Sequence, residues 1–348
     1  MSNDDAASGT ARNRRRGEPT SYDVALRAGV SQSAVSRCYR LGASVAPKTR
    51  ARIITAATEL GYQPNALAQG LISGRSNVVA VLISNLTNLY YPEVLATLSQ
   101  MLSDRDMRVL LFALRNESEV DQILDQLWRH RVDGAIVAAR LSDAQIRLFE
   151  KKNVALVLYN RVSDTEPAAS ICCDSATGEA QMVGRLLKAG HRRFGIIAGP
   201  DDSYVGEERR RAALACLAQA GIVDVPVARG EFSYESGGEA FRVLMAERAQ
   251  YDALLCVNDV MALGAMDCAR EEFGLAIPRD LSVVGFDGVD PAGWASYRLT
   301  SIRQPVSRMA EAAIETLIER IEDPDLSPER RMFSGQFITG RSARLDPA

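Results

Sequence analysis

The strongest constraint on the fold of this 348-residue chain is a regular alternation of apolar strands and amphipathic helices that starts near residue 78. Strands are predicted by apolar, β-branched runs at 78–83, 109–112, 134–137, 154–158, 194–197, 253–257 and 281–286. Helices are predicted at about 91–104, 118–130, 142–151, 176–189, 207–220, 235–248, 259–273 and 306–322. Strict alternation predicts parallel sheets with helices on both faces, and this many units favour two sheets over one open sheet.

Polar residues follow several of the predicted strands, at 84–91, 159–161, 199–208, 258–259 and 287–288. In open sheets of this kind, ligands bind beyond the carboxyl ends of the strands. These segments are rich in Asn, Asp, Tyr and Ser, which orient a small polyhydroxylated or amide-bearing ligand through hydrogen bonds. We therefore expect a ligand site at these strand ends.

Residues 20–37 predict two short helices joined by a tight turn. Thr20 and Asp23 have the spacing of a capping box. Gly29 suits the turn, and Ser31 can cap the second helix. The side chains that this second helix leaves pointing outward are Gln32, Ser33 and Arg37. Because Arg and Gln can each pair with a base edge, the hairpin suits the DNA major groove; a surface hairpin without a DNA role is the alternative.

Three further segments complete this part of the chain. A third helix is predicted from Pro47 to Gly61, with apolar positions at helical spacing: Ile53, Ile54, Ala57 and Leu60. In residues 62–76, Asn65 can cap a short helix that is too weak to persist unless it is held, which suits a switch; an ordinary linker is the alternative. Residues 1–17 predict a disordered basic arm.

Charge is distributed unevenly along the chain. The whole sequence has 41 Lys+Arg and 44 Asp+Glu, a net charge of −3. Residues 1–75 hold 11 basic and 5 acidic residues, a balance of +6, which leaves −9 for the remainder. A basic segment attracts polyanions, whereas an acidic one does not. Since the basic segment contains the predicted helix-turn-helix, we favour nucleic acid as its partner over a merely solvated basic face.

Motifs typical of catalysis and metal binding are missing from the sequence. It contains no G-x-S-x-G, P-loop, GxGxxG or H-x-x-x-H pattern. His130 and His191 each end a helix beside an arginine, where we expect them to face solvent or interact with the helix dipole. The six cysteines show no C-x-x-C spacing, which predicts reduced, mostly buried thiols. The sequence therefore predicts no enzyme, no metal site and no cofactor.

Signals for membranes or secretion are also missing. No apolar run approaches the length of a transmembrane helix, and the first residues lack the apolar core of a signal peptide. The expected location is the cytoplasm, and the resemblance described next implies a bacterial cytoplasm and association with the nucleoid.

The order and spacing of several motifs resemble the LacI/GalR family of bacterial transcription repressors over about residues 19–345. These motifs are Tyr22-Asp23-Val24-Ala25, Ala28-Gly29-Val30-Ser31, Val35-Ser36-Arg37, Thr49-Arg50, Leu60-Gly61-Tyr62-x-Pro64-Asn65, Val132-Asp133-Gly134, Gly190-His191-Arg192, Asn258-Asp259 and Val284-Gly285-Phe286-Asp287. The resemblance implies an all-α helix-turn-helix headpiece with a hinge helix, followed by a periplasmic-binding-protein-like α/β core. That core would contain two doubly wound parallel-sheet subdomains joined by three crossovers.

The resemblance also implies domain boundaries. The headpiece would span 18–64, the hinge helix and linker 65–76, and the effector-binding and dimerisation core 77–348. One subdomain would comprise 77–175 and 304–332, and the other 176–303 and 333–345.

For DNA, the resemblance implies contacts from the second helix, from residues near phosphates and from a hinge helix in the minor groove. The residues concerned are Tyr22, Ser31, Gln32, Ser33, Ala34, Ser36, Arg37, Tyr62, Asn65, Ala68 and Leu71. Leu71 matches the leucine that the family inserts between base steps. Two headpieces of a homodimer would meet on a palindromic operator of double-stranded DNA.

For the core, the resemblance implies a small-molecule effector, with a sugar or sugar acid favoured and a nucleobase as an alternative. The matching effector contacts are Tyr90, Tyr91, Asn160, Arg209, Asn258 and Asp287. The implied function is repression of sugar or sugar-acid catabolic and transport genes. A solute-binding protein of transport without a DNA role is the alternative from another class, and a sugar-metabolising enzyme is a third interpretation.

The sequence departs from the family pattern at several positions. Ala34 replaces the usual Thr, the segment Cys38-Tyr39-Arg40 differs from the common Val-Leu-Asn, and Ala46 replaces a frequent capping Ser. Ala212 and Ala213 replace a Gly and an aromatic residue, which leaves Arg210 as an alternative to Arg209. The chain shows no C-terminal leucine heptads, so we expect a dimer without a tetramerising helix.

Overall fold

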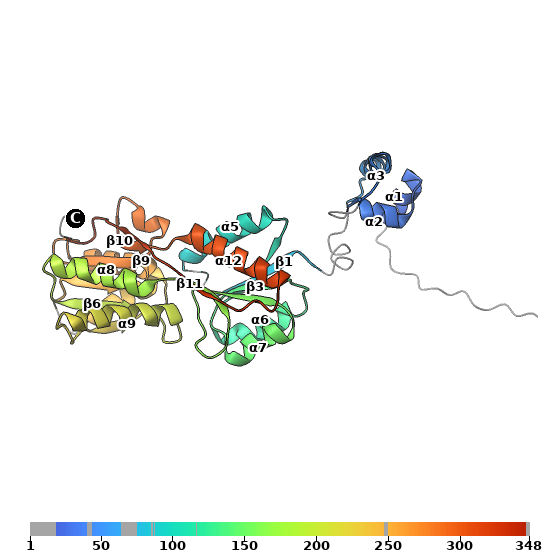
Figure 1. The fold of residues 1–348 in the computed structure, drawn as a ribbon. Coiled ribbons are helices and arrows are strands. Elements are labelled where there is room, and N and C mark those ends of the chain that lie inside the picture. The colour runs from blue at the N-terminus through green and yellow to red at the C-terminus, as the bar shows by residue number, and fades with distance from the viewer. Residues whose placement is uncertain are drawn as a thin grey trace, which may run out of the picture. The chain divides into compact units, whose positions relative to one another are not determined.

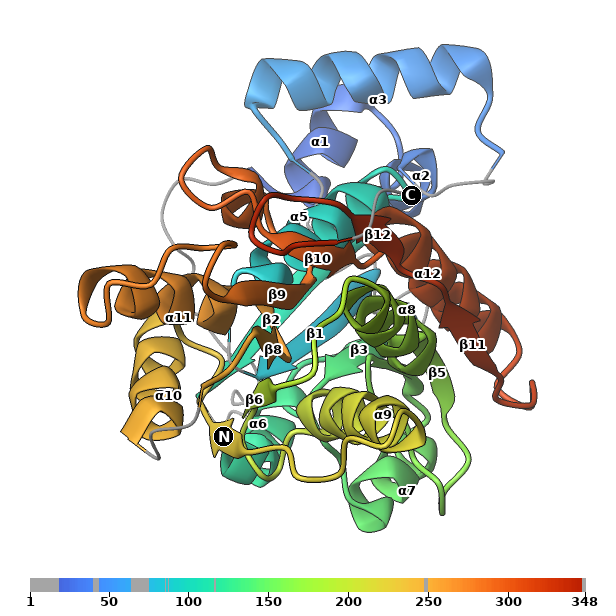
Figure 2. The same cartoon turned by 90° about the vertical axis from the view of Figure 1, so that its left-hand side faces the viewer.

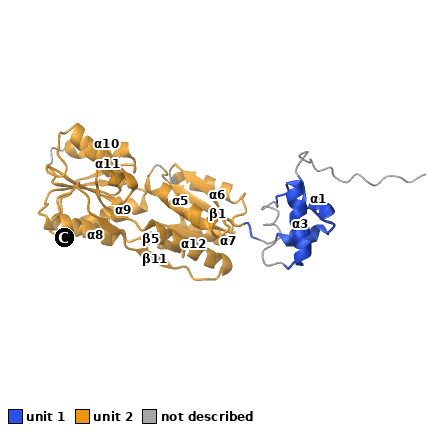
Figure 3. Ribbon diagram, turned by 90° about the horizontal axis from the view of Figure 1, so that it is seen from above, with its two compact units in different colours: residues 1–76 blue, residues 77–348 orange. Residues whose placement is uncertain are grey.

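The protein divides into two compact units, Met1–Ser76 and Asn77–Ala348 (Figure 3). A computed structural model of the chain describes residues 19–39, 44–63, 75–84, 86, 88–115, 117–246 and 250–345. The predicted basic arm at 1–17 lies outside these ranges. Most of the predicted hinge segment also lies outside them, including the proposed DNA contacts Asn65, Ala68 and Leu71.

The described residues of the first unit form three helices, α1 (Ser21–Ala28), α2 (Gln32–Cys38) and α3 (Pro47–Leu60). All three were predicted. Helix α3 begins at Pro47 without a side-chain cap, because Ala46 has no group that could supply one. It ends at Gly61, whose φ of 66° is in the left-handed region that glycine tolerates best.

The caps of α1 and α2 confirm the predicted turn chemistry. Thr20 Oγ1 accepts a hydrogen bond from Asp23 N, and Thr20 N donates to Asp23 Oδ2 at 2.7 Å, so the capping box is complete. Gly29 ends α1 with φ at 61°. Ser31 Oγ accepts a hydrogen bond from Ala34 N and caps α2. These local bonds fix the angle at which α2 leaves the turn.

Small and branched apolar side chains fill the space between the three helices. The buried members of this core are Val24, Ala25, Ala28, Val35, Cys38, Ile53, Ala56 and Ala57. Ile54, which helical spacing grouped with Ile53, is 47% exposed and lies outside the core. Arg52 braces the turn from α3, because its guanidinium donates to the carbonyls of Ala28 and Gly29.

The second unit contains two six-stranded sheets (Figure 1). The strand order is β11-β5-β4-β3-β1-β2 in the first sheet and β12-β10-β9-β8-β6-β7 in the second. All paired strands are parallel except β10 and β12. The first sheet comprises β1 (Val78–Ser84), β2 (Arg108–Leu114), β3 (Gly134–Ala138), β4 (Ala155–Tyr159), β5 (Ala169–Cys173) and β11 (Arg330–Phe333). The second comprises β6 (Phe194–Ala198), β7 (Val227–Arg229), β8 (Ala253–Cys256), β9 (Ser282–Asp287), β10 (Thr300–Arg303) and β12 (Gln336–Ile338).

Helices cover both faces of each sheet, as strand–helix alternation predicts. Val79, Val81 and Ile83 of β1 belong to the core on the side of α5 (Tyr90–Ser103) and α12 (Val306–Glu322). The alternate residues of β1 pack on the opposite side against α6 (Val120–Leu127), which follows the short η1 (Glu117–Glu119), and α7 (Asp143–Lys151). Figure 2 shows the second sheet between one helix pair, α8 (Ser175–Lys188) and α9 (Tyr204–Gln219), and another, α10 (Tyr234–Ala246) and α11 (Asp259–Glu271).

Three connections pass between the two sheets: β5 to α8, β10 to α12, and β11 to β12. The fold is therefore the predicted pair of doubly wound subdomains. One predicted boundary is wrong by a residue: Phe333 was assigned to the second subdomain, but it pairs with Cys173 in the first sheet. The subdomains share a single hydrophobic core along these connections.

All seven predicted strands are present, but five strands were not predicted. Of these, β7 and β12 have three residues each, and β11 begins with two arginines. These three are edge strands, where one side of the ribbon lacks a neighbour. Short or charged edge strands do not produce the apolar run that identified the central strands.

His191 does not face solvent as predicted. Its side chain is 1% exposed, and Nε2 lies 3.0 Å from the carbonyl oxygen of Arg344 and 3.3 Å from Ser282 Oγ. The ring therefore holds the segment that follows β12 against the second sheet. His130 is exposed, as predicted.

The six cysteines are free thiols, and all but the half-buried Cys216 are buried, which confirms that prediction. Within the described ranges, no helix combines the length and apolarity that crossing a membrane requires.

Candidate functional site

Helix α2 presents a polar edge from which the predicted base-reading residues project. Ser33 and Arg37 are exposed, and Arg37 Nε donates a long hydrogen bond of 3.4 Å to the Ser33 carbonyl. Ser31 Oγ lies 2.9 Å from Ser33 Oγ. Gln32 is half-buried, and its Nε2 is 3.3 Å from Ser21 Oγ. The free guanidinium face of Arg37 is thus one turn away from a cluster of hydroxyl groups.

The remaining described DNA-contact predictions surround this edge. Tyr22 on α1 is 70% exposed, and Ser36 is half-buried. Ala34 is also half-buried and packs against the headpiece core, so its methyl group supports α2 from behind. Tyr62 lies 6.1 Å from the Tyr39 ring, and burial raises the pKa of both phenols. Each phenol therefore stays protonated and can act as a hydrogen-bond donor.

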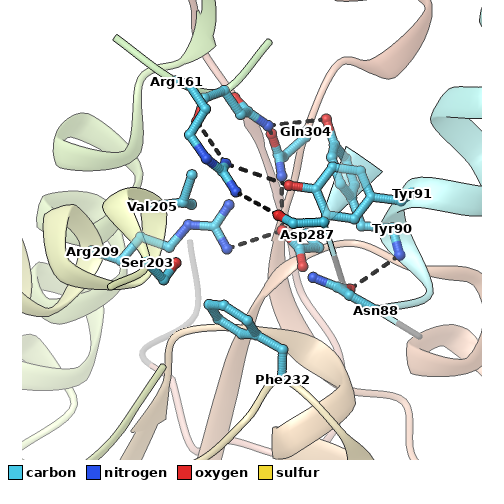
Figure 4. Close-up of a pocket in the computed structure, with 12 residues that line it drawn as sticks. Asn88, Tyr90, Tyr91, Arg161, Ser203, Val205, Arg209, Phe232, Asp287 and Gln304 are labelled. Carbon is cyan, nitrogen blue, oxygen red and sulfur yellow. Dashed lines mark hydrogen bonds and ion pairs between the residues drawn. The ribbon is translucent and has the colours of Figure 1, made fainter. Parts of the chain in front are cut away.

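The second candidate site is a pocket between the two sheets of the second unit, with about 360 Å³ free of protein atoms when the space open to solvent is included (Figure 4). Five of the six predicted effector contacts line it: Tyr90, Tyr91, Asn160, Arg209 and Asp287. The tyrosines start α5 just beyond β1, Asn160 follows β4, and Asp287 ends β9. The pocket therefore lies at the carboxyl ends of strands from both sheets, where ligands bind in folds of this type.

A buried ion pair between Arg209 and Asp287 lies in the wall of this pocket. The guanidinium Nη1 is 2.9 Å from Asp287 Oδ1, and each side chain is 2% exposed. Arg209 Nη1 also donates to the Val257 carbonyl at 2.7 Å, and its guanidinium lies 3.8 Å from the centre of the Phe286 ring. Arg210 instead pairs with Glu207 at 2.6 Å. Of the two arginines that the sequence left as alternatives, Arg209 lines the pocket and Arg210 does not.

Two atoms of this ion pair have unused bonding capacity among the described residues. Asp287 Oδ2 and Arg209 Nε are buried and make no hydrogen bond of good geometry there, although the side chain of Asn88 lies close enough to Asp287 to act to lower its pKa. Burial by itself acts to lower the pKa of Arg209, but the adjacent Asp287 carboxylate raises it, so the guanidinium stays charged. Since a buried polar atom without a partner costs roughly 1–3 kcal/mol, a ligand hydroxyl that bonds to Asp287 Oδ2 would be stabilised.

A chain of hydrogen bonds continues from Asp287 into the other subdomain. Gln304, in the connection between β10 and α12, donates to Asp287 Oδ1 at 2.7 Å and accepts from Asn160 Nδ2 at 2.9 Å. Asn160 Oδ1 accepts from the backbone N of Cys173, in β5, at 3.0 Å. The Tyr90 hydroxyl lies 3.3 Å from Asn160 Nδ2. This chain joins the pocket to two of the three connections between the subdomains.

Asn258 does not line the pocket. Its side chain is fully buried, and Oδ1 accepts a hydrogen bond from Met261 N at 3.0 Å, which caps α11. Asn at the end of a strand and the start of a helix fits a cap as well as a ligand contact. The structure assigns it the cap.

Several lining residues were not named individually as ligand contacts. Ser84, Asn88, Arg161 and Ser203 lie within the strand-end segments where the site was expected, whereas Phe232 and Gln304 lie outside those segments. Arg161 had a visible signal, since it directly follows Asn160 at the same strand end. Phe232 had none: its φ is 58°, and its ring packs where a Cβ on Gly199 would approach Cζ within 2.5 Å. A bulky residue in the left-handed region marks a strained position, which is common at ligand sites.

Both units of the chain are similar to known proteins. Residues 20–65 match the family described as bacterial regulatory proteins, lacI family, and residues 183–343 match the periplasmic binding protein-like domain. The transcriptional regulator AscG of Escherichia coli strain K12 is 31% identical over 326 residues, which cover 92% of this chain and 96% of AscG. The chain belongs to the lacI family of bacterial regulatory proteins.

Solved structures of lacI-family regulators are similar over nearly the whole chain. A Lac repressor dimer bound to operator and the anti-inducer ONPF has a TM-score of 0.85 at 26% identity, and the match covers 93% of this chain and 99% of that one. A complex of the transcriptional regulator CelR with cellobiose has a TM-score of 0.71 at 29% identity, with 94% and 100% covered. The protein is thus a DNA-binding transcriptional repressor of the lacI family, which excludes both the enzyme and the solute-binding protein without a DNA role.

Proposed function

We propose that this lacI-family repressor binds a palindromic operator as a homodimer and that a sugar or sugar acid in the pocket controls its affinity for DNA. The observation that carries this proposal is the convergence of Tyr90, Tyr91, Asn160, Arg209 and Asp287 on one buried pocket. These residues come from strand ends and helix starts far apart in the chain, and two of them form a charged pair with unused bonding capacity.

On the DNA side, α2 lies in the major groove in this proposal. Arg37 pairs with a guanine, and Gln32 and Ser33 contact neighbouring bases. Ser31, Ser36, Tyr22 and Tyr62 lie near phosphates, which position the headpiece without reading sequence. The capping bonds and the Arg52 contact to the turn hold α2 rigid relative to α3. Asn65, Ala68 and Leu71 serve the minor groove in the same proposal.

On the ligand side, the pocket offers aromatic surface and directional polar groups. Phe232 and the tyrosine rings provide faces for an apolar side of a sugar ring. Arg209 donates to a ligand oxygen, and Asp287 Oδ2 accepts from a ligand hydroxyl. The similar CelR structure contains cellobiose, which supports a carbohydrate for this chain.

Coupling between pocket and DNA follows from the placement of the pocket at the subdomain connections. A ligand that bonds to Asp287 alters the hydrogen-bond chain through Gln304 to Asn160. That change favours a different angle between the subdomains, and so a different dimer geometry and hinge order.

The experiment has two steps with full-length protein. Selection from a random duplex pool should enrich a motif with two-fold symmetry, because a dimer presents two α2 helices. A thermal-shift panel of sugars and sugar acids then identifies a ligand, and its effect on operator affinity is measured by fluorescence anisotropy. Enrichment of an asymmetric motif would contradict the dimer, and a bound ligand without effect on operator affinity would contradict the control function.

A further inference from the structure

The ligand pocket continues into a second, wider space between the subdomains. The inner pocket is the space in Figure 4 that contains Arg209 and Asp287. The outer chamber, of about 990 Å³ including its open mouth, is lined by segments at 140–143, 161–165 and 201–204 together with Glu207 and Arg211. Arg161 and Ser203 line both spaces. Arg161 therefore lies between the two spaces.

The two spaces differ in charge. The described lining of the inner pocket has two guanidinium groups, on Arg161 and Arg209, and one carboxylate, on Asp287, a net charge of +1. The described lining of the outer chamber has three arginines and five carboxylates, a net charge of −2. Asp201 pairs with Arg229 at 2.6 Å, and the net charge of the chamber lining stays negative when this pair is counted as neutral. An anion entering the cleft is thus stabilised in the inner part.

Among the described lining residues of the inner pocket, Asp287 is the one acid, and its carboxylate already has partners. Asp287 Oδ1 is 2.9 Å from Arg209 and 2.7 Å from Gln304. Glu179 also interacts electrostatically with Arg209 but does not line the pocket, and burial raises the pKa of Glu179 to about 8. At pH 7 this acid is mostly protonated and does not cancel the positive excess.

Arg161 is held with its guanidinium in the pocket wall. It is 5% exposed, and Nη1 donates to the Asn160 carbonyl at 2.9 Å. Its bonds to the Tyr91 hydroxyl and to Ser84 Oγ are long, at 3.4 Å each. In Figure 4 the guanidinium points toward the Tyr91 hydroxyl. A planar cation positioned this way suits a carboxylate, which it can bind with two parallel hydrogen bonds.

We propose that the effector is a sugar acid with one carboxylate, that Arg161 binds this carboxylate, and that Arg161 sets the preference for the acid over the matching neutral sugar. The inference rests on the proposed function and narrows its ligand class. A single negative charge matches the inner excess of +1, whereas the doubly charged phosphate of a sugar phosphate would exceed it and would meet the acidic outer chamber. If Arg161 only supports the pocket wall through its hydrogen bonds to Tyr91 and Ser84, the protein should not prefer the acid over the neutral sugar.

The first test measures binding of matched ligands to full-length protein by isothermal titration calorimetry. The probes are D-glucose with D-glucuronate, D-galactose with D-galacturonate, and D-glucose 6-phosphate. We expect at least one acid to bind about tenfold or more tightly than its neutral sugar. Equal or tighter binding of the neutral sugars overturns this inference but leaves the proposed function intact. Tighter binding of the phosphate overturns the single carboxylate, and binding of no probe overturns the sugar-class effector as well.

The second test assigns the preference to Arg161. Arg161→Gln should weaken binding of the acid by about tenfold to a hundredfold and change that of the neutral sugar by less than about twofold. The control Arg210→Gln removes an arginine that lines neither space and should keep the preference. An unchanged ratio of acid to neutral affinity in Arg161→Gln overturns the assignment. If that variant does not fold, Arg161→Lys keeps the charge but loses the planar fork, and an undiminished affinity for the acid in it overturns the assignment too.

Discussion

The two sites of this repressor are built in opposite ways. The proposed DNA-reading edge of α2 uses exposed side chains, Ser33 and Arg37, that lie within one turn of each other in the sequence. The ligand pocket uses buried side chains, such as Arg209 and Asp287, that lie 78 positions apart. Exposed residues on a short helix can change without cost to the fold, whereas the buried pair is part of the fold. Specificity for DNA and stability of the core are therefore separable by mutation.

The largest effect on stability is expected from removing one member of the buried pair of Arg209 and Asp287. Arg209→Met leaves the Asp287 carboxylate buried without its cation and should destabilise the second unit by about 3–5 kcal/mol. The control Arg210→Met removes a partly exposed partner of Glu207 and should cost no more than about 1 kcal/mol. Urea denaturation of both variants gives the comparison. If both variants lost the same free energy of unfolding, the pair in the pocket would contribute no more to stability than a pair at the surface.

The corresponding change on the headpiece should alter recognition without altering the fold. Arg37→Ala should cost about 1–3 kcal/mol in binding to the selected operator and little in binding to unrelated duplex, because the side chain reads a base. Arg27→Ala, at an exposed pair with Glu59, is the matched control. Anisotropy titrations on both DNAs provide the readout, and an unchanged operator preference in Arg37→Ala would remove the base-reading role.

A third change tests how the turn holds α2. Gly29→Ala places a Cβ at a φ of 61° and within 2.8 Å of Arg52 Nη2. The left-handed conformation alone costs about 1–2 kcal/mol for a residue with a Cβ. Gly61→Ala has a similar φ with no atom within 4 Å, so it should cost less than Gly29→Ala. Amide hydrogen exchange in the headpiece measures both, and equal costs would show that the Arg52 contact adds nothing.

The smallest predicted effect concerns pH. Burial raises the pKa of Glu179 to about 8, so the folded protein binds a proton that the unfolded chain has released. The contribution of Glu179 to the free energy of unfolding is fully present below the ordinary pKa of Glu and decreases as the pH rises toward 8. Between pH 7 and pH 8 the decrease is about 1 kcal/mol. Glu179→Gln should flatten this part of the stability profile, and Glu271→Gln, at an exposed helix position, should not. Identical profiles for the two variants would exclude Glu179 as the source.

Much of the fold follows from local patterns. The capping box at Thr20 and Asp23, the turn at Gly29 and seven of the strands have signals within a few residues, and each was predicted. The edge strands β7, β11 and β12 lacked such a signal, because their sequences are short or charged. The central strands β5 and β10 were missed as well. His191 was misjudged for a similar reason, since its burial depends on a segment about 150 residues later in the chain.

The candidate pocket was predictable only where topology brings strand ends together. Tyr90, Asn160 and Asp287 lie at or just beyond the ends of predicted strands, whereas Gln304 directly follows β10 and Phe232 comes soon after β7, two strands that were not predicted. Asn258 shows the limit of the rule: it follows a strand, but its side chain is used by the next helix. Residue type and position at a strand end identify candidates, and only the geometry separates ligand contacts from caps.

The central claim is that occupancy of the buried pocket changes how the exposed edge of α2 binds DNA. The most direct measurement is the affinity of the full-length protein for its selected operator, with and without a saturating ligand whose binding calorimetry has established. We expect the dissociation constant to change by about fivefold or more, as for a coupling of at least 1 kcal/mol. An operator affinity that is the same with the pocket full and empty would contradict the claim.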